Sequence, residues 1–200
     1  MSEKQAFTIG VLAMQGAFRE HEQMLQSLGC AAVQVRQPEQ LDELDGLILP
    51  GGESTTIGKL MADFGLDTAI RERAAQGMPL WGTCAGLILL AQRIERSEQK
   101  RLGLMDITAV RNAFGRQVDS FEIGLAIPAI DAGGESAYPA VFIRAPYIAE
   151  AGPDVQILAQ HEGKTVLARQ GHLLASAFHP ELTKDNRMHR YFLAMVAEQA

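Results

Sequence analysis

Short apolar strands alternate with helices along the first half of this sequence. The apolar runs are 7–13, 31–35, 46–49 and 80–83. The helical patterns between them are 18–28, 55–64 and 67–75. Strands without a polar face, separated by helices, are typical of a parallel sheet that is covered on both sides and joined by right-handed crossovers. This alternation therefore predicts an α/β fold.

The second half of the sequence changes character, because short strands follow one another with turn-rich gaps between them. We expect strands at 107–110, 123–127, 140–143, 155–159, 165–169 and 173–177, and a closing helix at 188–198. Gly163-Lys164 predicts a hairpin, and 131–139 predicts a surface loop. The chain is long enough for one full core. We predict a single domain over 1–200, a flavodoxin-like three-layer fold with a central mixed, mostly parallel sheet.

Charge and cysteine content exclude several classes of protein. The net charge of −6 and the pI near 5.4 argue against a nucleic-acid partner, which usually needs a basic stripe. Two cysteines without paired spacing give no disulfide framework and no zinc signature, so we expect no metal. We also expect no targeting segment and no membrane partner, since the longest uncharged apolar stretch, 78–91, is too short to span a bilayer.

Cys84 lies in the sequence Trp-Gly-Thr-Cys-Ala-Gly at 81–86, between a predicted strand and a predicted helix at 87–91. A strand, a Gly-x-Cys-x-Gly turn and a helix make a nucleophile elbow. The helix N-terminus favours the thiolate, which is the reactive form of cysteine. A free thiol nucleophile also indicates a reducing compartment, the cytoplasm. By itself, the motif is equally compatible with a reactive nucleophile and with a buried structural cysteine.

His179 and Glu181 follow the strand predicted at 173–177. Residues two apart in an extended chain point the same way, so Glu181 is placed to hold the imidazole that His179 presents to Cys84. The other histidines have weaker support. His21 lies among charged residues and is expected to be solvated or in a local ion pair, whereas 161, 172 and 189 have no partner motif. Cys30 is expected to be a buried small residue.

Three segments lie at the carboxyl ends of predicted parallel strands: 13–15, 50–54 and Cys84. Ligands of such sheets bind at these strand ends. The amide of Ala85, next after the cysteine, is placed to donate to an oxyanion, and Gly51-Gly52 could supply a second amide. Arg111 and Arg144 stand beside apolar strand residues, where they suit a carboxylate-bearing substrate.

Pro-Gly-Gly-Glu-Ser at 50–54, Gly-Thr-Cys-Ala-Gly at 82–86 and Phe-His-Pro-Glu at 178–181 together resemble the class I (triad) glutamine amidotransferases. Nearly the whole chain resembles one branch of this family, the glutaminase subunits of pyridoxal 5′-phosphate synthase. The segments that carry this closer resemblance are 10–17, 19–21, 36–41, 45–56, 111–122 and 142–146. The sequence departs from the family pattern at Trp81, where a smaller residue is usual, and in a longer 131–138 loop.

The resemblance implies hydrolysis of L-glutamine to L-glutamate and ammonia, with the ammonia passing to a separate synthase (lyase) subunit. It implies Cys84, His179 and Glu181 as the triad and Gln15 near the oxyanion site formed with Gly52 and Ala85. It implies that glutamine is held by Gly52, Glu53, Ser54, Arg111, Ile143 and Arg144. No organic cofactor is needed for these steps.

Two other functions remain open at this stage. A stand-alone cysteine hydrolase of the γ-glutamyl hydrolase type would use the same residues, but would act fully without a partner. A non-catalytic module that uses an elbow cysteine as a redox sensor would need neither His179 nor Glu181.

Overall fold

Parallel strands form the first half of the main sheet. A computed structural model describes residues 7–111, 120–131 and 136–199. In it, β1 (Thr8–Leu12) pairs with β2 (Ala31–Val35) on one side and β3 (Gly46–Leu49) on the other, and β4 (Leu80–Thr83) follows β3. Every residue of β3 and β4 is buried, as expected for strands without a polar face.

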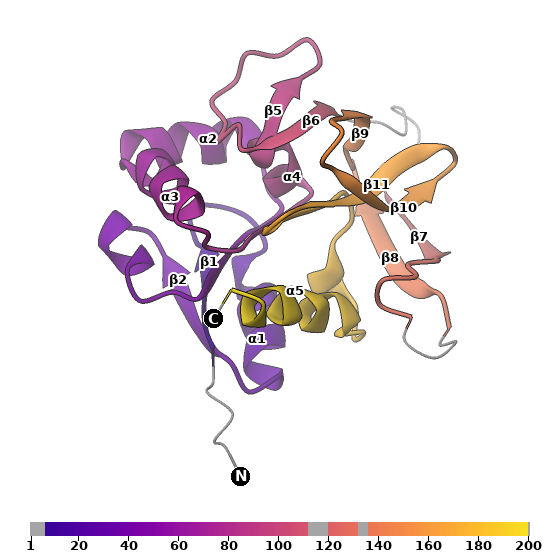
Figure 1. Ribbon diagram of the computed structural model, residues 1–200, viewed down its shortest axis with the longest axis horizontal. Helices are drawn as coiled ribbons and strands as arrows, with labels where there is room; N and C mark the ends of the chain where they lie inside the picture. Colours follow the sequence, from indigo (N-terminus) through magenta and orange to yellow (C-terminus); the bar gives the residue numbers. More distant parts are fainter. Residues whose placement is uncertain (1–6, 112–119, 132–135, 200) are drawn as a thin grey trace.

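Helices cover both faces of this sheet (Figure 1). On one side lie α1 (Phe18–Ser27) and α5 (Arg187–Ala197). On the other side lie α2 (Ser54–Asp63), α3 (Leu66–Ala75) and α4 (Ala85–Leu90). The predicted three-layer α/β architecture is therefore confirmed. Among the described residues, no helix has the length and apolar character that a membrane span requires.

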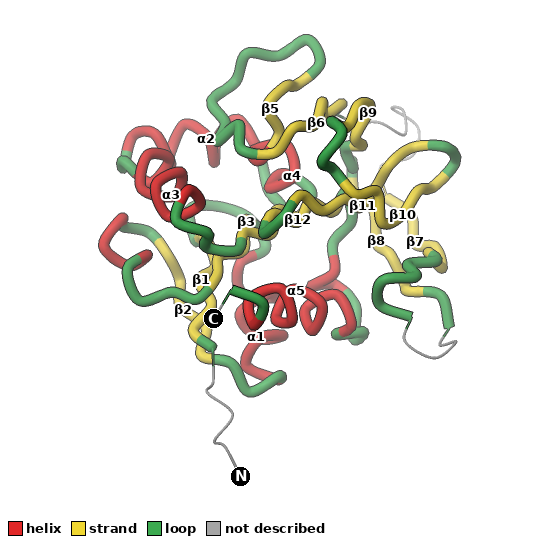
Figure 2. The backbone as a smooth tube through the Cα atoms, in the orientation of Figure 1, coloured by secondary structure: helices red, strands yellow, loops and turns green. Residues whose placement is uncertain are grey.

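A strand from late in the sequence joins the two halves of the sheet. β12 (Leu173–Ser176) pairs in parallel with β4 and antiparallel with β11 (Lys164–Gln170). The sheet continues from β11 through β9 (Tyr147–Ala151) and β6 (Met105–Val110) to β5 (Ala91–Ile94) (Figure 2). The sheet is thus mixed: the strands from β2 to β12 are parallel, and β5 and β6 form a second parallel pair at the far edge.

Two hairpins complete the second half. β10 (Gln156–His161) pairs with β11 through the predicted turn, where Glu162 and Gly163 both have positive φ. β7 (Ser120–Leu125) and β8 (Tyr138–Ile143) form a separate two-stranded sheet rather than joining the main one.

The structure corrects some expected elements. β5 and β9 were not expected, and the helix predicted at 87–91 is α4, which begins at Ala85 and ends where β5 begins. Two 3₁₀ turns, η1 (Pro38–Leu41) and η2 (Pro180–Leu182), were not expected either. Residues 132–135 of the predicted loop, and residues 112–119 of the family-like 111–122 segment, lie outside the described residues.

Candidate active site

Cys84 lies in a tight turn between β4 and α4. It is the N-cap of α4, with φ 48° and ψ −100°, a backbone conformation that non-glycine residues rarely adopt. A side chain at Gly82 would begin 2.4 Å from the backbone of Gly86, and one at Gly86 would begin 2.0 Å from the carbonyl oxygen of Leu49. The backbone N–H of Cys84 donates to the Ser176 carbonyl at 2.8 Å. Both flanking glycines are therefore required by the close packing of this turn.

His179 and Glu181 are joined by a short hydrogen bond. Nδ1 of His179 donates to Oε1 of Glu181 at 2.7 Å, and both residues are buried. The physical reason differs from the expected one, because the chain is not extended here: η2 begins at Pro180, and this turn brings the two side chains together. The backbone N–H of His179 donates to the Val141 carbonyl at 2.8 Å.

The side chains of Cys84 and His179 both lie against Gly51. A Cβ at Gly51 would lie 2.4 Å from Cε1 of His179 and 3.4 Å from Cβ of Cys84. Burial alone would lower the pKa of His179, but hydrogen bonds and charge interactions with Cys84 and Glu181 raise it to about 10. The imidazole is therefore held by an acidic partner on each side, a geometry suited to proton transfer with the thiol.

Gln15 fixes the loop that contains Gly51. Its Oε1 accepts a hydrogen bond from the backbone N–H of Glu53 at 2.7 Å and lies against Gly52, where a Cβ would come within 2.5 Å of it. The carbonyl of Gly51 accepts a hydrogen bond from the N–H of Ala17 at 3.1 Å. Because the peptide bond is planar and trans, the N–H of Gly52 points away from Ala17.

Arg111 lies at the rim of this loop. One guanidinium nitrogen is 3.5 Å from Oε1 of Glu53, and the other donates to Oε1 of Gln99 at 3.2 Å. Ser54 is the first residue of α2, and Glu53 is the N-cap of this helix. The hydroxyl of Ser54 also donates to Gln99, at 3.4 Å. No pattern in the sequence pointed to Gln99.

Ile143 and Arg144 approach the cysteine from β8. The Cys84 thiol lies 3.8 Å from the carbonyl oxygen of Ile143. Arg144 follows directly, is exposed and has a φ of 42°. Ala85, on the other side, is the first residue of α4. Its N–H therefore has no hydrogen-bond acceptor within the helix. The predicted site residues therefore come from both halves of the chain to one end of the sheet.

The expected environment of His21 is wrong. His21 is completely buried, not solvated, because α1 turns it inward. Its Nε2 is 3.2 Å from Oε2 of Glu181 and 3.3 Å from the hydroxyl of Thr83. Its Nδ1 is 3.0 Å from Nε2 of His189, which is also completely buried. The charged neighbours of His21 in the sequence gave no signal of this burial.

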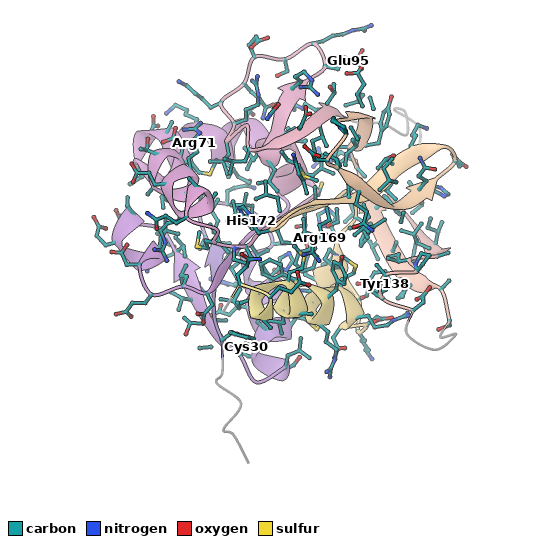
Figure 3. The ribbon with its side chains drawn as sticks, viewed as in Figure 1. Cys30, Arg71, Glu95, Tyr138, Arg169 and His172 are labelled. Carbon is teal, nitrogen blue, oxygen red and sulfur yellow. The ribbon has the colours of Figure 1, made fainter. Side chains whose placement is uncertain are left out.

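The remaining candidates for chemistry lie elsewhere. Cys30, at the end of α1 (labelled in Figure 3), is half-buried, and burial raises the pKa of its thiol. Within the ranges that the structure describes, no group of three or more His, Cys, Asp or Glu side chains is arranged to hold a metal ion.

Comparison with known proteins identifies the family. The model of the SNO glutamine amidotransferase family matches residues 11–198. A protein from Carboxydothermus hydrogenoformans named "Pyridoxal 5′-phosphate synthase subunit PdxT" is 60% identical over 190 residues, which cover 95% of this chain and 98% of that protein. A protein of the same name from Brevibacillus brevis is 58% identical over 95% of this chain and 97% of its own length.

A solved structure supports the same relation. The structure described as "Crystal structure of glutamine amidotransferase" superimposes with a TM-score of 0.89 at 50% identity, and covers 94% of this chain and 98% of that one. A match over nearly the whole chain in sequence and in fold is what common family membership requires. The chain belongs to the SNO glutamine amidotransferase family.

Proposed function

We propose that this chain is the glutaminase subunit of a pyridoxal 5′-phosphate synthase, with Cys84, His179 and Glu181 as its catalytic triad. The names of its relatives and the family support the activity. The observation that carries the triad is the position of His179, which is hydrogen-bonded to Glu181 and interacts with Cys84 across Gly51. Two free cysteines and the use of one as nucleophile favour the cytoplasm.

Cys84 supplies the nucleophile for amide hydrolysis. The raised pKa of His179 favours the imidazolium, so His179 is suited to accept the thiol proton as the sulfur attacks. The sulfur adds to the side-chain amide carbon of glutamine, and His179 then gives its proton to the departing nitrogen, which leaves as ammonia. Water attacks the resulting thioester with His179 as base, which releases glutamate and restores the thiol.

Backbone amides stabilise the negative charge on the substrate oxygen. The N–H of Ala85 adjoins the nucleophile at the start of α4, and the N–H of Gly52 comes from the neighbouring loop. Gln15 contributes by holding that loop through the backbone N–H of Glu53. The side chain of Gln15 thus supports the oxyanion site by fixing the loop that carries Gly52.

The rim of the site binds the amino-acid end of glutamine. The residues assigned to this role are Gly52, Glu53, Ser54, Arg111, Ile143 and Arg144. A guanidinium recognises the α-carboxylate, and the carboxylate of Glu53 suits the α-ammonium group. Arg111 already pairs with Glu53, so the two side chains are placed to bind neighbouring groups of opposite charge on one ligand.

Replacement of Arg111 by alanine is expected to lower kcat/KM for glutamine about 10-fold to 100-fold, since a hydrogen bond to a charged group contributes about 1.5–3 kcal/mol. Most of the effect is expected in KM. Arg93→Ala is the matched control, because Arg93 pairs with Asp106 on the surface, away from the cysteine turn. If Arg111→Ala and Arg144→Ala each left kcat/KM unchanged, both arginines would be structural.

The partner is expected to be a synthase (lyase) subunit that receives the ammonia directly, since most ammonia released to water at neutral pH is protonated and no longer nucleophilic. We expect the isolated chain to hydrolyse glutamine slowly, and the cognate synthase subunit to raise kcat several-fold or more. Ammonia release with and without that subunit measures this. An equal kcat in both conditions would instead favour a stand-alone hydrolase of the γ-glutamyl hydrolase type.

A further inference from the structure

A second pair of imidazoles lies behind Glu181, on the side away from His179. Oε1 of Glu181 accepts from His179, whereas Oε2 lies 3.2 Å from Nε2 of His21. The other nitrogen of His21, Nδ1, lies 3.0 Å from Nε2 of His189. His21 comes from α1 and His189 from α5, and neither has any exposed surface. The sequence-predicted triad thus continues inward through two more titratable side chains.

The surroundings of His189 fix the direction of these hydrogen bonds. Burial, followed by the influence of His21, lowers the pKa of His189 well below its ordinary value, so this ring is neutral and carries one N–H. Its Nδ1 is buried and has no hydrogen-bond partner among the described residues. A proton there would be an unsatisfied buried donor, so the proton belongs on Nε2, which donates to Nδ1 of His21.

The hydrogen bond from His189 also determines which nitrogen of His21 faces Glu181 as a donor. Because Nδ1 of His21 accepts from His189, the N–H that His21 donates is on Nε2, which faces the carboxylate of Glu181. Burial alone would raise the pKa of Glu181, but the electrostatic interaction with His21 and the hydrogen bond from His179 lower it. Glu181 therefore remains a carboxylate: His179 is hydrogen-bonded to Oε1, and Nε2 of His21, 3.2 Å away, is the donor nearest to Oε2, which has no hydrogen bond of standard geometry among the described residues.

Aromatic packing holds these rings in place. The indole of Trp81 meets both imidazoles edge-on, with ring centroids 5.7 Å from His21 and 5.0 Å from His189. The indole itself is anchored, since its N–H donates to the hydroxyl of Ser176 at 3.0 Å. The large residue at 81 therefore closes off the inner end of the chain of hydrogen bonds.

We infer that His21 is a positioning residue for this reaction: by donating to the second oxygen of Glu181, it holds the carboxylate in the plane that His179 needs. This inference rests on the proposed triad. A carboxylate held at only one oxygen can rotate about its last side-chain bond and carry Nδ1 of His179 with it. His21 prevents that rotation, and so keeps the imidazole of His179 in place while its other nitrogen gains and loses a proton.

The test compares two replacements of His21 in the chain assembled with its synthase subunit. His21→Leu removes the donor and is expected to lower kcat about 10-fold to 100-fold, the loss that corresponds to one hydrogen bond to a charged group, with KM for glutamine nearly unchanged. His21→Gln places an amide N–H near the position of Nε2 and is expected to recover most of kcat. His21→Asn is too short to reach Glu181 and should behave like His21→Leu, so it replaces that variant if leucine prevents folding.

A double-mutant cycle separates positioning from general stability. If His21 acts through the carboxylate, His21→Leu should cost almost nothing in a Glu181→Ala background, whereas a purely structural role would give the same loss in both backgrounds. Equal losses in the two backgrounds, a glutamine variant no better than asparagine, or a His21→Leu enzyme with wild-type kcat would each overturn the inference. Cys84→Ala is assayed in parallel: if it stays active, the triad itself is wrong, and if it is inactive, such results at His21 overturn this inference alone.

Discussion

Cys84→Ala is expected to abolish glutamine hydrolysis, with kcat falling on the order of 10⁴-fold or more, as for other covalent nucleophiles. No other group at the turn can form the thioester. The fold should survive, because Cys84 already adopts a positive φ as a residue with a Cβ, and alanine adds no bulk to the packed turn. Ammonia release in the presence of the synthase subunit measures the loss, and thermal melting checks the fold.

Cys30→Ala is the matched control for this change. Its thiol lies at the end of α1 and has a pKa raised by burial, so full activity is expected without it. Mass spectrometry of a trapped glutamyl thioester should find the adduct on Cys84. An adduct on Cys30, or more than a few per cent of activity in Cys84→Ala, would remove Cys84 from its assigned role.

His179→Asn is expected to lower kcat on the order of 10²–10⁴-fold, the usual contribution of a positioned acid or base. Asparagine keeps a polar group near Glu181 but cannot hold a proton for the thiol or the leaving ammonia. Single-turnover rates of ammonia release, with glutamine saturating, measure the chemical step directly. A negligible loss would exclude His179 from the site.

Glu181→Gln is the informative comparison for this variant. We expect a smaller loss than in His179→Asn, since Glu181 orients and stabilises the imidazole and moves no proton. A loss does follow, because an amide has a single oxygen acceptor for the two imidazole N–H groups that face this position, His179 and His21. Equal kcat losses in the two variants would mean that the carboxylate does more than orient.

Much of the fold could be predicted from local patterns in the sequence. Ala31–Val35, Gly46–Leu49 and Leu80–Thr83 have the bounds that were expected. The last two are fully buried, and such strands are short apolar runs that turn residues bound in the sequence. β5 was missed because it starts at Ala91 with no turn after α4, and two of its four residues are exposed and polar. β9 was missed because its Tyr-Ile-Ala-Glu-Ala sequence shows no sustained alternation and is mostly exposed.

Some residues of the site could likewise be predicted from local motifs, whereas others depend on long-range contacts. The cysteine turn and the His-Pro-Glu segment are local motifs, so the sequence alone indicated Cys84, His179 and Glu181. His21 could not be recognised, because its burial depends on α5, more than 160 residues later in the chain, where His189 packs against it at 3.0 Å. Gln99 could not be recognised either, since its contacts with Ser54 and Arg111 depend on how a loop folds back over α2.

The position of β12 has a consequence for the nascent chain. β12 occupies the place next to β4, yet its residues, Leu173–Ser176, are synthesised after all the other strands of the sheet. Until they emerge from the ribosome, β4 is the unprotected border of the growing sheet, and its Leu-Trp-Gly-Thr sequence carries no charge to discourage pairing with other chains. The cysteine turn also lacks its backbone partner, Ser176, during that interval. Completion of the sheet and completion of the cysteine turn therefore both depend on the same late segment of the chain.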